Sequence, residues 1–394
     1  MAITKATIQA VNALTCRWAG VVDGGSVFSA AGAWPLLAFL ADGATGPARE
    51  ELAEALGVPA DEAAHAARGL LATMEKMRGL DTALGLWTRR TLELREAWEA
   101  GLPAEAHGVL TADPAADRKA LDAWAAKRTG GLIERMPVTL TDDTEMVLAS
   151  ALTLRTKWLR PFDEVPLYSP HWPGWTDRPL LALRRATLLL DRIGVADTPD
   201  GHLTELKVFG ADGIDVHLLL GEEQMTPGQV LGAGVNLLAG RHPVVPGTLL
   251  PYGDVGPGLR IQKVRSATPD PPTLDVATAA FDVTADHDLL AHHELFGLTT
   301  ARDTDEGRFP GISALPLAVG SAQQSATAEF GAKGFRASAV TAFAPVGAGA
   351  IPRLRWTTTR LRARFDRPFG FLALHRHSRL VLAAGWITEP KPFD

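Results

Sequence analysis

The order of the periodic patterns constrains the fold of this chain more than any single motif does. Helical spacing of apolar residues dominates the first third, as in residues 47–56, where Gly57 follows as a helix stop. Residues 119–136 repeat this pattern until the paired glycines at 130 and 131 interrupt it. Strand-like patterns follow at residues 146–154, 180–190, 204–208, 215–220, 273–283, 322–328, 369–374 and 380–387. Helices first and antiparallel-compatible strands afterwards predict one α+β domain over residues 1–394.

The composition excludes several classes of protein. With 394 residues, 46% of them hydrophobic, the chain can bury a large core. A net charge of -6 argues against a general nucleic-acid binder, which needs a dense basic surface. No apolar run is long enough to span a bilayer, so we expect neither nucleic acid nor a membrane as partner. Gln9 and Asn12 interrupt the N-terminal apolar stretch, so we expect no signal peptide and a cytoplasmic protein.

The chain has one cysteine, Cys16, which cannot form a disulfide within the chain. A catalytic thiol is one interpretation of this residue. Val11, Leu14 and Trp18 surround it at helical spacing, and this favours a small side chain packed in a helix.

Residues 334–344 form a strand-like run of small residues with no hairpin partner nearby. Gly334 allows the chain to turn sharply. Ala337, Ala339 and Thr341 share one face at a period of two. The prolines and glycines that follow return the chain to loop. The run predicts either an ordinary edge strand or a strand that can enter a sheet without being obliged to.

The densest titratable cluster lies at residues 286–294. The candidate metal ligands or acid/base groups in it are His287, Asp288, His292, His293 and Glu294. No His-Glu-x-x-His frame is present, which favours the polar face of a helix over a metal site.

His171, Trp172 and Trp175 flank a Pro-Gly turn and are candidates for a ligand pocket. Two tryptophans are costly to expose, and aromatic walls beside a histidine can hold a flat organic ligand. Packing of both rings onto a sheet is the alternative interpretation. The chain has no Gly-x-Ser-x-Gly motif, phosphate loop or dinucleotide fingerprint, so we expect no cofactor.

Taken in order along the chain, several short motifs resemble those of the serpin superfamily. Trp158 stands where a central strand of that family carries a tryptophan, and residues 124–133 are similar to its Trp…Thr-x-Gly-x-Ile helix end. The matching segments are residues 27–37, 43–52, 124–133, 152–162, 308–313 and 365–372, with Gly385. We expect a bacterial member of the family with a divergent hinge and sheet-opening region.

The resemblance implies an α+β serpin fold with about three β-sheets, eight or nine helices and an exposed reactive loop at about residues 332–362. In serpins a serine protease cleaves this loop, and the freed strand inserts into the central sheet and traps the acylated protease. The implied function is therefore suicide-substrate inhibition of a serine protease without a cofactor. The alternative is a non-inhibitory serpin-fold protein that binds or transforms a small molecule, or binds a protein partner.

Alignment on Gly334 gives the hinge of the implied loop. Its residues are Ala332, Gly334, Phe335, Arg336, Ala337, Ala339 and Thr341. Small side chains suit insertion, but Phe335 stands where the family has a small or hydroxyl residue, and Arg336 where an acidic residue is usual. We expect Phe335 to slow insertion, because about 3 kcal/mol on the barrier is about a hundredfold in rate.

The sheet-opening region of serpins usually carries two serines, an asparagine and a histidine. The matching positions here are Ser29, Gly32, Ser150 and Gln324, with Trp158 nearby. Of the first four, we expect only Ser29 to fit the family pattern.

The long spacing between Gly334 and Pro368 leaves two candidate scissile regions open. Counting forward from the hinge gives Gly347, Ala348 and Gly349, which suit an elastase-like protease. Counting back from Pro368 gives a region where Arg353 or Arg355 suits a trypsin-like protease. A solvated charged strand is the alternative interpretation of these arginines.

Overall fold

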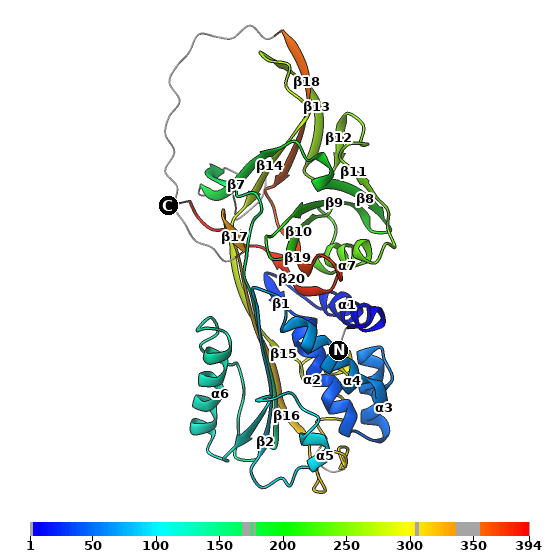
Figure 1. The fold of residues 1–394 in the computed structure, drawn as a ribbon, viewed down its shortest axis with the longest axis vertical. Coiled ribbons are helices and arrows are strands. Elements are labelled where there is room, and N and C mark those ends of the chain that lie inside the picture. The colour runs from blue at the N-terminus through cyan, green and yellow to red at the C-terminus, as the bar shows by residue number, and fades with distance from the viewer. Residues whose placement is uncertain (1–2, 168–174, 176–178, 304–306, 336–354, 394) are drawn as a thin grey trace.

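The computed structural model describes residues 3–167, 175, 179–303, 307–335 and 355–393. Within these residues it has eight α-helices and three β-sheets, as the resemblance to serpins implied. We call the sheets the central, second and third sheet. The central sheet is the long vertical layer in Figure 1, and the other two lie toward the top of that view.

The central sheet has the strand order β3-β2-β4-β16-β17-β5, with β15 also paired to β16. Its strands are β2 (Leu80–Arg89), β3 (His107–Leu110), β4 (Met146–Leu154), β5 (Thr156–Lys157), β15 (Phe281–Asp288), β16 (Val319–Phe330) and β17 (Gly334–Phe335). All nine residues of β4 are buried, which explains why its sequence is a continuous apolar run.

The second sheet has the order β1-β20-β19-β10-β9-β8-β11. Its strands are β1 (Ser26–Phe28), β8 (Ile193–Thr198), β9 (Gly201–Val208), β10 (Ile214–Leu220), β11 (Val244–Pro246), β19 (Phe369–His375) and β20 (Val381–Ile387). The third sheet has the order β12-β13-β18-β14-β7-β6. Its strands are β6 (Asp163–Leu167), β7 (Leu180–Thr187), β12 (Gly253–Gly256), β13 (Leu259–Ser266), β14 (Thr273–Ala279) and β18 (Trp356–Phe365).

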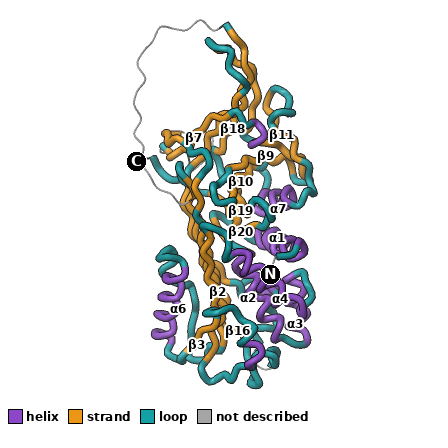
Figure 2. The backbone as a smooth tube through the Cα atoms, in the orientation of Figure 1, coloured by secondary structure: helices purple, strands orange, loops and turns teal. Residues whose placement is uncertain are grey.

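The helices cover the sheets unequally. They are α1 (Lys5–Ala19), α2 (Ala30–Gly43), α3 (Gly46–Leu56), α4 (Ala60–Met74), α5 (Glu96–Glu99), α6 (Pro114–Arg128), α7 (Pro227–Leu238) and α8 (His293–Phe296), with the 3-10 helix η1 (Leu190–Arg192). Helices α1 to α4 gather on one side of the central sheet and α6 lies on the other (Figure 2). Within the described residues, no helix combines the length and apolar character that crossing a bilayer requires.

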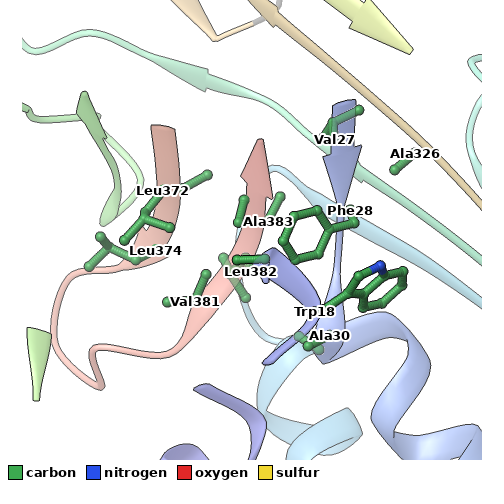
Figure 3. Packing of buried hydrophobic residues seen from close by; sticks show 14 of the residues in the cluster. Trp18, Val27, Phe28, Ala30, Ala326, Leu372, Leu374, Val381, Leu382 and Ala383 are labelled. Carbon is green, nitrogen blue, oxygen red and sulfur yellow. The ribbon is translucent and has the colours of Figure 1, made fainter. Parts of the chain in front are cut away.

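The core is continuous where the N-terminal helices meet the second sheet. Trp18 of α1 packs against Phe28 of β1, with their ring centroids 4.9 Å apart, and Leu382 of β20 lies beside them (Figure 3). Cys16 on the same helix is half-buried, and burial raises the pKa of its thiol. A neutral, packed thiol agrees with the structural interpretation of Cys16.

Two expected element boundaries are wrong. Residues 273–283 are not one strand, because the chain changes sheets at Ala280, between β14 and β15. The helix expected at 119–136 is α6, which starts earlier and ends at Arg128. The Thr129 hydroxyl accepts from the Ile133 amide, and Gly130 and Gly131 have positive φ, so the chain leaves the helical path there.

Two further expectations need correction. Residues 286–294 do not form a surface helix: β15 extends to Asp288, and α8 comprises only His293–Phe296. The loop expected to run to about residue 362 ends earlier, since β18 begins at Trp356. That strand pairs with β13 on one side and β14 on the other, which holds residues 356–365 firmly in the third sheet.

Candidate functional site: the split in the central sheet

Strands β4 and β16 are parallel neighbours at the centre of the central sheet. They pair from Val319↔Met146 to Ala326↔Leu152. β16 continues to Phe330, but its residues after Ala326 do not pair with β4. Figure 1 shows β17 at this upper end of the sheet. The two central strands therefore close along most of their length and separate at one end, and we call this separation the split.

Strand β17 occupies the split. Phe335 pairs with Phe330 of β16 on one side and with Thr156 of β5 on the other, and both pairings are antiparallel. The Gly331 amide also donates to the Gly334 carbonyl, which closes the turn from β16 into β17. A Cβ at Gly334 would stand 2.2 Å from the Thr156 carbonyl oxygen, so only glycine fits this close approach. The first two residues of the strand-like run are thus already part of the sheet.

Phe335 is buried, with 1% of its surface exposed. Its ring centroid lies 6.0 Å from that of Phe371 on β19, and the core continues to Phe281 and Phe330. We expected this large side chain to slow insertion at the hinge. Its ring has already entered the core, so the burial of Phe335 is not part of any remaining barrier.

The base of the hinge is held by Trp158. Its indole nitrogen donates to the Gly331 carbonyl at 2.9 Å, and its amide donates to the Lys333 carbonyl at 3.0 Å. The Phe162 amide likewise donates to the carbonyl of Ala332, which is itself buried. These three bonds attach residues 331–333 to the segment between β5 and β6.

Four of the expected sheet-opening residues come together below the split. Gln324 Oε1 accepts from the Ser29 amide at 2.7 Å, and Gln324 Nε2 donates to the Ser29 carbonyl and to Ser150 Oγ, each at 2.9 Å. Ser29 Oγ donates to the Leu382 carbonyl and accepts from the Gly32 amide. A Cβ at Gly32 would lie 3.4 Å from Gln324 Nε2, so this glycine borders the group.

The expectation that only Ser29 fits the family's residue pattern stays a prediction, but Gln324 takes part in this group through both atoms of its amide. A glutamine amide both donates and accepts, so Gln324 alone joins the N-cap of α2 to β4 across the central strand pair. Ser29, Ser150 and Gln324 are each 0% exposed. Their hydrogen bonds are therefore costly to break without replacement.

Comparisons with known proteins agree with this geometry. The family described as Serpin (serine protease inhibitor) matches residues 8–169. Serpin-Z2A of Oryza sativa subsp. japonica is 32% identical over 153 residues, which are 34% of this chain and 35% of that protein. Putative serpin-Z6A of the same plant is 34% identical over 149 residues, covering 34% and 38%. The chain thus aligns with little more than a third of the length of these relatives.

The likeness to solved structures extends over the whole fold. A thyroxine-binding globulin complexed with thyroxine has a TM-score of 0.72 at 18% identity, covering 98% of this chain and 99% of that one. The thermophilic serpin Tengpin in its native state has a TM-score of 0.75 at 13% identity, covering 99% and 95%. The chain therefore has the serpin fold, and its residues 8–169 match the serpin family. The bacterial origin stays a prediction, since the matched curated relatives are plant proteins.

Part of the reactive loop that the resemblance to serpins implied lies outside the described residues. That part contains Arg336, Ala337, Ala339, Thr341, Gly347, Ala348, Gly349 and Arg353. Arg355 is described and exposed, directly before β18. Both candidate scissile regions therefore remain open.

The structure describes only part of the expected ligand pocket. His171 and Trp172 lie outside the described residues. Trp175 is 1% exposed, its indole nitrogen donates to the Thr388 carbonyl at 2.8 Å, and its ring approaches Phe369. Trp175 is thus packed in the core, as the alternative interpretation predicted.

The titratable cluster at 286–294 does not converge on one point. His287 Nε2 donates to the Val27 carbonyl at 2.9 Å, whereas His293 Nδ1 lies 2.9 Å from Thr299 Oγ1. Among the described residues, no three His, Cys, Asp or Glu side chains are placed to hold a metal ion. His287 is opposite Gln324 in the β15–β16 register, so it borders the group formed by Ser29, Ser150 and Gln324.

Sequence reasoning missed a buried ion pair in the second sheet. Glu205 Oε1 lies 2.7 Å from His217 Nδ1, and the two side chains are 3% and 1% exposed. Burial alone would raise the pKa of Glu205, but the hydrogen bond and charge of His217, with Lys207, lower it to about 2. The available signal was a titratable residue inside each of two neighbouring strand patterns, Glu205 in residues 204–208 and His217 in residues 215–220.

Proposed function

We propose that this protein inhibits a serine protease by acting as a cleavable bait whose freed loop completes the central sheet. One observation carries the proposal. The two central strands are parallel neighbours, and the hinge already lies between β16 and β5 at the split. An inserting strand has a starting point in register and two strand edges to pair with.

The decisive experiment is incubation with an elastase-like and a trypsin-like protease, followed by a denaturing gel. Inhibition by loop insertion gives a covalent complex that survives denaturation. Cleavage by the elastase-like enzyme points to the region of Gly347, and cleavage by the trypsin-like enzyme points to Arg353 or Arg355. Mass spectrometry of the released C-terminal peptide identifies the bond.

Two matched variants test whether insertion is required. The period of two in the sequence puts Ala337 on the same side as Phe335 and Ser338 on the opposite side. Ala337→Arg should abolish the covalent complex and leave only the clipped chain, whereas Ser338→Arg should retain the complex. If wild type gives only the clipped chain with both protease classes, inhibition of those enzymes is rejected.

A second candidate function is binding of a small molecule or a protein partner by a loop that does not insert further. The large, anchored side chain of Phe335 favours it, because the serpin family has a small residue at that position. The thyroxine-binding globulin neighbour was solved with thyroxine. Melting before and after loop cleavage separates the candidates: a large rise supports insertion, and an unchanged melting temperature supports the second candidate.

A further inference from the structure

Three arginines gather above the hinge base, where the central and third sheets meet. Arg160 lies in the segment between β5 and β6 that anchors the hinge, Arg185 lies on β7, and Arg192 ends η1. Arg185 Nη1 donates to the Arg160 carbonyl at 2.5 Å, and Arg160 Nη1 donates to Thr187 Oγ1 at 3.2 Å. Arg160 therefore lies over the end of β7 that carries Arg185.

Aromatic rings fix two of these guanidinium groups. Arg185 Cζ lies 4.3 Å from the centroid of Phe162, and Arg192 Cζ lies 4.0 Å from that of Phe209. Stacking on an aromatic face holds the plane of a guanidinium in one orientation. The N–H groups of these arginines are thus oriented in advance of any ligand.

Negative charge is scarce around this cluster. Arg192 has Asp191 at 3.3 Å, but among the described residues no carboxylate lies within ion-pair distance of Arg160 or Arg185. Glu164, which shares the face of Arg185 by register, forms no ion pair with it. Burial, followed by the charges of Arg160 and Arg192, lowers the pKa of Arg185 to about 10. Within the described residues, the charges of Arg160 and Arg185 are therefore not compensated by a carboxylate, whereas Arg192 is paired with Asp191.

One buried donor in the cluster is also unused. Arg185 Nε is buried and has no hydrogen-bond partner within the described part of the chain. Buried polar atoms are nearly always paired, so an unpaired guanidinium donor beside two further arginines calls for an acceptor from outside.

We propose that Arg160, Arg185 and Arg192 bind a tetrahedral oxyanion, phosphate or sulfate. Forked guanidinium groups match the oxygens of such an anion, and three arginines from three separate segments can engage different oxygens of one ion. The bound anion cross-links the segment between β5 and β6 to β7. Because Trp158 and Phe162 of that segment hold residues 331–333, the anion also stabilises the hinge base.

The test is calorimetric titration of the full chain with inorganic phosphate, without any protease. Chloride keeps the ionic strength constant, because non-specific attraction to arginines is screened by salt. We expect one phosphate per chain. Arg185→Gln and Arg160→Gln should each weaken binding about tenfold or more.

Arg184→Gln is the matched control, because Arg184 is the exposed neighbour of Arg185 on the opposite face of β7. It should bind phosphate as wild type does. Arg185→Lys keeps the charge but loses the fork, and it should also weaken binding while the melting temperature without phosphate stays near that of wild type. Absence of saturable binding in wild type, equal losses in Arg184→Gln and Arg185→Gln, or full binding by Arg185→Lys would overturn the site. None of these outcomes depends on whether the loop inhibits a protease.

Discussion

Gln324 Nε2 donates to Ser150 Oγ across the central strand pair at 2.9 Å, and the two residues are directly opposite each other in the parallel register. Both side chains are fully buried. A strand that enters between β4 and β16 must break this bond. The Gln324–Ser150 contact therefore resists opening of the sheet, while the bonds from Gln324 to Ser29 hold α2 against β16.

Replacing Gln324 with methionine should weaken the closed sheet. Gln324→Met keeps the side-chain volume but leaves the Ser29 amide and the Ser150 hydroxyl without their hydrogen bonds to Gln324, at about 1 to 3 kcal/mol for each buried group. Urea unfolding should show this loss. The control is Gln323→Met, since Gln323 is 6% exposed on the same strand and its side chain forms no hydrogen bond with the described residues. Equal stability of the two variants would contradict a bridging role for Gln324.

Removing the ring of Phe335 should destabilise the native protein. Phe335→Ala leaves a cavity beside Phe371, and such truncations typically cost about 3 to 5 kcal/mol. Phe335→Leu fills most of that space and should cost much less. Chemical unfolding measures both. A wild-type stability for Phe335→Ala would mean that β17 contributes nothing to the closed state.

The Glu205–His217 pair should make stability depend on acid pH. The folded pKa of Glu205 is lowered from 4.5 to about 2, so its contribution is complete above pH 4.5 and is lost as the pH falls toward 2. The difference corresponds to about 3 kcal/mol. Glu205→Gln should remove this pH dependence in urea unfolding at pH 3 to 7.

The matched control for Glu205 is Glu222. Hydrogen bonds from the His202 backbone and side chain lower the pKa of Glu222 to about 2 as well, but this carboxyl is exposed. Solvent screens exposed pairs, so Glu222→Gln should change stability far less than Glu205→Gln does. Similar losses in the two variants would contradict burial as the source of the effect.

His287 should give a second pH dependence, in a higher range. Burial lowers its pKa below 6.5, and its Nε2 donates to the Val27 carbonyl. The unfolded chain therefore takes up a proton before the folded chain does, and stability is lost as the pH falls below 6.5. Melting temperatures between pH 5 and 8 should decline less in His287→Gln than in wild type. His292→Gln, at an exposed position, should follow the wild-type curve.

Local patterns located most strands because burial is encoded in consecutive residues. The apolar run at 146–154 coincides with β4, where both faces of the strand are buried. The run at 273–283 gave no sign of its division, because its apolar pattern continues through Ala280 while its partners change from β7 and β18 to β16. Membership of a sheet depends on distant pairing partners, and local spacing does not contain that information.

The sequence predicted which residues form the site, but it did not predict how they are hydrogen-bonded to one another. Resemblance to serpins identified Ser29, Ser150 and Gln324 as positions, but the bridging role of Gln324 depends on its register with a residue 174 positions away. The sequence also marked Phe335 as unusual. Whether that ring lies in solvent or in the core depends on the space left by Phe371, which the local pattern does not report.

The antiparallel pairing of Phe335 with Phe330 and Thr156 has a kinetic consequence. The first contact of a strand with a sheet is a slow nucleation step, because it fixes the chain before further hydrogen bonds offset the lost conformational entropy. Here that nucleus exists in the resting molecule. The rate at which the sheet gains a strand would then depend on how fast pairing propagates past Gln324. It would not depend on how often a free strand first meets the sheet.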